Sequence, residues 1–108
     1  MAATLLKSSV ITVSAAEQAV TVLGLPSPGA VAVQITGTLS ATITFEATVD
    51  GTNWVAFNLL PAASTTAAST ATAVGIWTAD SKGIAGFRAR CSAYTSGAPV
   101  VTVRYAAI

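Results

Sequence analysis

The sequence predicts an all-β protein built as an antiparallel β-sandwich of about seven or eight strands. Apolar and polar residues alternate with a period of two along most of the chain, and β-branched residues are frequent. The spacing of an amphipathic helix is almost absent. Clusters of Gly, Pro, Asn, Asp and Ser separate the alternating segments at short intervals. A chain of 108 residues can bury one sizeable core, so we expect a single domain over residues 1–108.

Eight segments carry the alternation and are expected to be strands: 10–13, 19–23, 30–37, 41–49, 54–60, 73–78, 86–94 and 100–106. Turn signals lie at 26–29, 50–53, 80–83 and 95–99. The low-complexity stretch 61–72 lacks a large apolar side chain, which favours a surface loop or a poorly paired edge. This pattern is typical of jelly-roll and immunoglobulin-like sandwiches.

The expected core follows from the inward positions of these strands. Its members are apolar and recur at every second residue. They are Val31, Val33, Ile35, Ile43, Phe45, Phe57, Val101 and Val103.

One hairpin can be assigned between 41–49 and 54–60. Pairing Val49 with Val55 keeps the apolar positions of both strands on the core side and leaves a three-residue loop.

The turn of this hairpin contains four residues to which we assign structural roles. Gly51 and Asn53 would supply left-handed backbone, and Asp50 would accept hydrogen bonds from backbone N–H groups. Trp54 would cover the turn. None of the four is expected to bind a ligand.

A second hairpin is expected between 86–94 and 100–106, with Cys91 paired to Val103 on the core side. This register sets Arg90 opposite Arg104 on the outer face, with Arg88 one step along. Like charges directly opposed across strands are destabilising, so these arginines require acidic partners. Three alternatives are open: solvated arginines near Glu46, an ion pair with another subunit, or binding of a small anion.

The residue types needed for most enzyme chemistry are missing. Without histidine and with one cysteine, neither a zinc site nor a histidine-based catalytic triad can be assembled. The carboxylates Glu17, Glu46, Asp50 and Asp80 do not suggest the facing pair of a glycosidase, and one carboxylate in the 50–53 turn is too few for calcium. We therefore expect no catalytic residue, no cofactor and no metal, and predict that the chain is not an enzyme.

The charge pattern limits the partners. Five basic residues against four acidic ones give a net charge of +1 without a basic run, which argues against nucleic acid as a partner. Mean hydropathy is +0.70, but no apolar run is long enough for a membrane helix, and the first residues lack a signal-peptide pattern. With only 8% charged residues, much of the surface must be Ala, Thr and Ser. Such a surface suits a subunit covered by neighbours, so we expect a homo-oligomer.

Several motifs resemble those of a known group of proteins. Residues 37–46 (GTLSATITFE) followed by 50–54 (DGTNW) begin the pattern, and 86–90 (GFRAR), 93–97 (AYTSG) and 101–104 (VTVR) continue it. Over residues 30–106 the chain resembles small β-sandwich structural proteins of tailed-phage virions, such as capsid decoration proteins and tail appendages.

The resemblance implies a structural role in the virion, after synthesis in the host cytoplasm. The expected role is a capsid decoration or cement protein that stabilises a phage head, with the major capsid protein as partner and a trimer as its assembly. The alternative is a carbohydrate-binding or structural module of a phage tail, baseplate or fibre.

Five residues are candidates for the interface with other virion proteins. Residues 1–9 would form an N-terminal arm whose Leu5 and Leu6 are exposed unless a neighbour covers them. Arg88, Arg90 and Arg104 would be the polar anchor.

Overall fold

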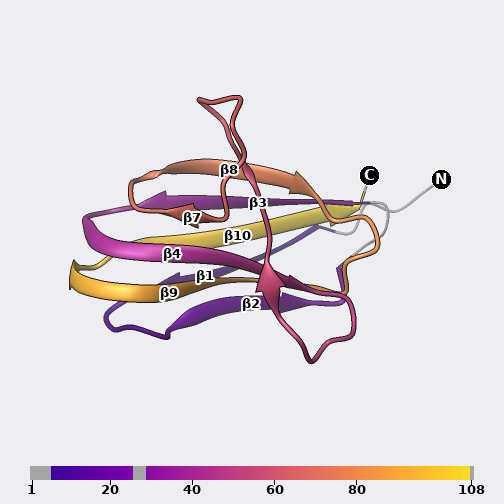
Figure 1. The fold of residues 1–108 in the computed structure, drawn as a ribbon, viewed down its shortest axis with the longest axis horizontal. Helices are drawn as coiled ribbons and strands as arrows, with labels where there is room; N and C mark the ends of the chain where they lie inside the picture. Colours follow the sequence, from indigo (N-terminus) through magenta and orange to yellow (C-terminus); the bar gives the residue numbers. More distant parts are fainter. Residues whose placement is uncertain (1–5, 26–28, 108) are drawn as a thin grey trace.

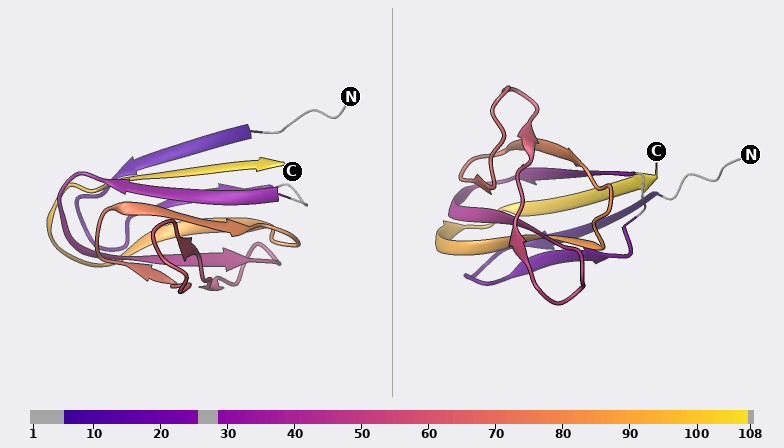
Figure 2. Two further views of the ribbon diagram at one scale, coloured as in Figure 1. Left: turned by 90° about the horizontal axis from the view of Figure 1, so that it is seen from above. Right: turned by 45° about the vertical axis from the view of Figure 1, so that its right-hand side comes forward.

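The computed structural model describes residues 6–25 and 29–107, and this part of the chain forms ten β-strands and no helix. The strands make two antiparallel sheets that face each other (Figures 1 and 2). The predicted antiparallel sandwich is therefore confirmed, with ten strands in place of seven or eight. No helix that could cross a membrane occurs among the described residues.

The first sheet has the strand order β1-β10-β3-β8-β6. Its long members alternate buried and exposed residues, because one face lies on the core and the other is open. The strands are β1 (Leu6–Thr12), β10 (Val100–Ala107), β3 (Gly29–Thr36), β8 (Gly75–Asp80) and β6 (Leu60–Pro61).

The second sheet has the order β2-β9-β4-β5, and β7 also pairs with β4. Two short strands, β5 and β7, share one edge of the long strand β4. Of the stretch 61–72, for which a surface loop or a poorly paired edge was expected, the two residues of β7 pair with this edge. The segment between β6 and β7 stands away from the sheets (Figure 1). The strands are β2 (Ala19–Leu23), β9 (Gly86–Gly97), β4 (Leu39–Thr48), β5 (Val55–Ala56) and β7 (Thr70–Ala71).

The chain changes sheet at every connection between successive strands except that between β4 and β5. The predicted hairpin of β9 with β10 is therefore wrong: Cys91 pairs with Ile43 in the second sheet, and Val103 pairs with Val33 in the first. Gly97 lies at this change of sheet with a φ of 99°, and a side chain there would collide with the backbone carbonyl of Thr38.

The hairpin of β4 with β5 exists, but in another register. Ala47, not Val49, pairs with Val55. The connection is longer than the predicted three residues, and both Val49 and Val55 are exposed rather than in the core.

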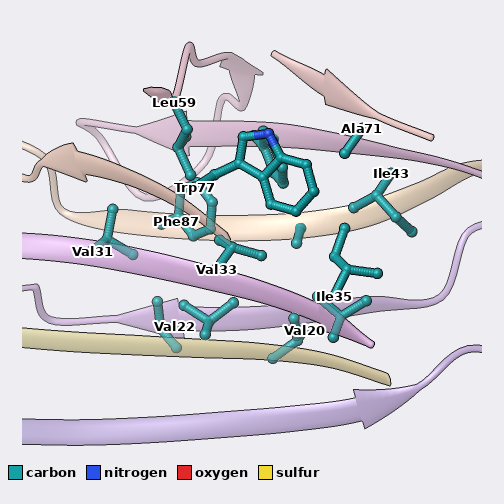
Figure 3. Close-up of a cluster of buried hydrophobic side chains, with 14 of the residues drawn as sticks. Val20, Val22, Val31, Val33, Ile35, Ile43, Leu59, Ala71, Trp77 and Phe87 are labelled. Carbon is teal, nitrogen blue, oxygen red and sulfur yellow. The ribbon is translucent and has the colours of Figure 1, made fainter. Parts of the chain in front are cut away.

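The core fills the space between the two sheets (Figure 3). Phe45 lies at its centre, with its ring centroid 5.7 Å from that of Trp77 and 6.3 Å from that of Phe87. Seven of the eight predicted core residues are buried, and Phe57 is half-buried against them. The buried seven are Val31, Val33, Ile35, Ile43, Phe45, Val101 and Val103.

The predicted N-terminal arm is only partly within the described residues. Residues 6–9 belong to β1, which pairs with β10 of the same chain from Leu6↔Ala106 onward. For these residues the arm prediction is wrong, because the edge of β10 satisfies their backbone. Leu5 lies outside the described residues.

Candidate functional site

The outer face of the second sheet carries a compact ion network. Strand pairing places Glu46 of β4 directly beside Arg88 of β9, and Arg90 follows two residues along. Glu46 Oε1 accepts hydrogen bonds from Arg88 Nε at 2.6 Å and from Arg90 Nε at 3.1 Å. Of the three alternatives open from the sequence, the structure shows the pairing of these arginines with Glu46.

The environment of Glu46 fixes its charge. Burial of the side chain favours the neutral acid, but hydrogen bonds from Arg90 and Arg88, together with their charges, outweigh it and lower the pKa of Glu46. The hydrogen bond to Glu46 in turn raises the pKa of Arg90.

Glu17 is a member of this network that the sequence did not indicate. Both of its carboxylate oxygens accept hydrogen bonds from Arg90 Nη1, at 3.1 and 3.0 Å. Glu17 is also the one non-glycine residue with positive φ, at 71°, in the part of the chain that the structure describes. Its position follows from the pairing of β2 with β9, a contact between distant segments that local alternation does not reveal.

Trp54 lies over the same network. Arg88 Cζ is 4.6 Å from the centroid of its ring, a cation–π contact. The ring edge also lies against Gly86, where a Cβ atom would come within 3.2 Å of it. Trp54 therefore packs on two residues of β9, and this contact leaves less of its ring as a platform for a sugar.

Arg104 is not part of this network. It lies in β10 of the first sheet, paired with Ser8 and Ala32, whereas Arg90 lies in the second sheet. The predicted juxtaposition of Arg104 with Arg90 is wrong, because β9 and β10 belong to different sheets. The sequence placed three arginines together, but the structure brings together only Arg88 and Arg90.

The turn after β4 is organised by Asp50. Its Oδ1 accepts hydrogen bonds from the backbone N–H groups of Thr52 and Asn53, both at 2.8 Å, which confirms the predicted role. These two bonds, with those from the side chains of Asn53 and Thr48, hold the pKa of Asp50 well below its ordinary range. Gly51 has a φ of 81°, as predicted, but Asn53 does not have positive φ. Asn53 instead donates from its side-chain amide to Asp50 Oδ2 at 2.7 Å.

Replacing Gly51 by alanine is expected to lower the free energy of unfolding by about 1 to 2 kcal/mol, since Ala resists left-handed backbone. No atom lies within 4 Å of the added Cβ, so the cost is conformational. Urea denaturation measures the change. Gly51→Asn is the matched control and should cost less, because Asn tolerates this conformation. Equal losses for Ala and Asn would contradict this assignment.

The sulfur of Cys91 is enclosed in the core, as predicted. Burial raises the pKa of its thiol, which disfavours the thiolate. Among the described residues, no group of three or more His, Cys, Asp or Glu could hold a metal ion.

No family model matches the chain, and no curated protein matches it. Solved structures with this fold include two prophage proteins. The SPBc2 prophage-derived protein YomS has a TM-score of 0.71 at 15% identity, over 97% of this chain and 98% of YomS. The PBSX exported protein XepA has a TM-score of 0.76 at 14% identity, over 94% of this chain but only 38% of XepA. The resemblance to phage β-sandwich proteins is thus matched at the level of the fold by two prophage proteins.

Proposed function

We propose that this protein is a non-enzymatic structural component of a phage particle, and that it decorates and stabilises the capsid. The observation that supports this most is the composition of its outer surface. Large apolar residues are exposed on both sheets, including Val10 in the first and Leu23 in the second. The whole chain has only nine charged residues. Such a surface is better suited to contact with neighbouring proteins than to a free monomer.

The shared fold supports the phage context. YomS corresponds to this chain over nearly its whole length, and XepA contains the fold as part of a longer chain. In the proposed role the protein is a homo-oligomer in the virion, and its partner is the major capsid protein.

A structural module of a tail, baseplate or fibre is the alternative. In XepA the fold accounts for 38% of a longer chain, so it can occur as one module of a larger prophage protein. A carbohydrate-binding role has less support, because Arg88 lies over the ring of Trp54. The two locations differ in copy number, because a capsid presents many more equivalent positions than a tail.

Quantitative mass spectrometry of purified particles of the encoding phage tests the proposal. A copy number approaching that of the major capsid protein is expected for decoration of the head. A number comparable to that of tail proteins would favour the alternative. Absence of the protein from intact particles would overturn both.

A further inference from the structure

The outer face of the first sheet, formed by the outward residues of β1, β10, β3 and β8, is almost uncharged. We call it the open face. Arg104 on β10 and Asp80 on β8 are its charged residues among those whose side chains the structure describes, and both are exposed. The rest of the face consists mainly of Ala, Thr, Val and Ile side chains.

Arg104 and Asp80 are too far apart to pair within one chain. Arg104 lies beside Ala32 of β3, whereas Asp80 lies beside Ala30, on the other side of the same strand. They are thus two strands and two residues apart, about 12 Å for ordinary strand spacing and rise. Neither forms an ion pair within residues 6–25 and 29–107.

The surface between Arg104 and Asp80 carries short side chains and is slightly recessed. Ala30 and Ala32 occupy the midpoint, and a shallow hollow of about 530 Å³ surrounds Ala32, with Gln34, Ile76 and Arg104 in its lining. Ile76 is 45% exposed beside it. Short side chains here let another sheet approach closely, and the exposed Ile76 gains by being covered.

We propose that the open face binds a second copy of this chain around a two-fold axis, with Arg104 of each copy opposite Asp80 of the other. A two-fold interface brings the same patch together from both subunits, so every contact occurs twice. The open face carries a positive group on one side of its recessed centre and a negative group on the other side, so it can pair with a copy of itself. If the two-fold axis lies in the plane of the interface, passes next to Ala30 and Ala32 and is perpendicular to the line from Arg104 to Asp80, each Arg104 faces Asp80 of the other copy and all four charges are paired.

The charge pattern also distinguishes this arrangement from the trimer that the sequence resemblance implied. In a trimer each subunit presents two different surfaces, so Arg104 would need a carboxylate outside the open face. The open face already holds both members of the ion pair. The pairing does not depend on the virion role.

The size of the open face limits the affinity expected for the dimer. The four strands of the open face give a patch about 20 Å wide and about 20 Å long. This is below the roughly 800 Å² per partner of a standard stable interface, so the dimer is expected to be weak. The dimer should therefore form at high chain concentration and dissociate on dilution.

Sedimentation of the purified chain across a concentration series tests the proposal. The wild-type protein should approach twice its mass of 10.7 kDa. Arg104→Asp and Asp80→Arg should each raise the dissociation constant at least about tenfold, because each sets two like charges face to face. The double variant Arg104→Asp with Asp80→Arg restores both pairs and should return to within about threefold of wild type.

Ser40→Arg, at an exposed position of the second sheet, is the matched control and should leave dimerisation unchanged. A wild-type chain that remains monomeric at high concentration, or that forms trimers, would overturn the proposal. So would a dimer that tolerates both single variants, or a double variant that stays monomeric while its circular dichroism matches wild type.

Discussion

Replacing Phe45 by alanine is expected to lower the free energy of unfolding by about 3 to 5 kcal/mol. The side chain is fully buried, and its ring contacts Trp77 of the first sheet and Phe87 of the second. Removing it opens a cavity at the point where the two sheets meet, and the close-packed surroundings can relax only partly. Urea denaturation monitored by circular dichroism measures the loss.

Val49→Ala is the control for this substitution. Val49 lies just after the same strand but is 75% exposed, so its truncation should change stability by less than about 0.5 kcal/mol. A loss below about 1 kcal/mol for Phe45→Ala would mean that the two sheets do not depend on this contact.

Burial could be predicted well for the long regular strands β3 and β10, because alternation is a local property. The residues of β3 and β10 that recur at every second position are buried where the pattern places them. The same logic explains why Tyr105 and Cys91 lie inside.

Alternation failed where a strand is irregular. Alternation from Cys91 predicts Ala93 on the core side, but β9 shifts register against β4 between Ile43 and Thr42, so that Ser92 is an extra residue. The extra residue reverses the alternation beyond it, and Ala93 is exposed while Tyr94 packs against the core. Ser92 is the only residue of a turn-forming type at this bulge, and a single Ser within an alternating stretch does not distinguish a bulge from a regular strand.

Strand pairing could not be predicted for a different reason. A hairpin between neighbouring segments is the simplest arrangement of two alternating stretches, but here nearly every connection crosses between the sheets. Either arrangement buries the same residues, so hydrophobicity does not choose between them. The strand pairing also determines the candidate site. Because β2 pairs with β9, Glu17 forms an ion pair with Arg90, and because β10 belongs to the other sheet, Arg104 lies on the open face.

Replacing Glu46 by glutamine is expected to cost about 2 to 3 kcal/mol at neutral pH. The side chain of Glu46 is 11% exposed, and its carboxylate forms ion pairs with the guanidinium groups of both Arg88 and Arg90. Glutamine keeps one acceptor oxygen but presents N–H groups toward an arginine, which leaves Arg88 and Arg90 without their shared counter-charge. Thermal and urea unfolding measure the change.

Glu17→Gln is the matched control, because Glu17 binds the same Arg90 through a carboxylate that is 69% exposed. Solvent screens this pair, and its loss should cost no more than about 1 kcal/mol. Equal losses for the two variants would show that burial of Glu46 does not govern the strength of the network.

The cost of Glu46→Gln is also expected to depend on pH. The pKa of Glu46 is lowered in the folded protein, so its ionisation stabilises the fold fully at pH values above the unfolded pKa of about 4.5. As the pH falls below about 5 and through the lowered pKa, protons bind first to the unfolded chain and this stabilisation is lost. The difference between wild type and Glu46→Gln should therefore be constant between about pH 6 and 8 and shrink steadily in acid. Unfolding free energies of both proteins, measured across this pH range, test the prediction. If the difference between wild type and Glu46→Gln grew as the pH fell, Glu46 would be protonated in the native network. Arg88 and Arg90 would then lack the negative counter-charge that the structure places beside them.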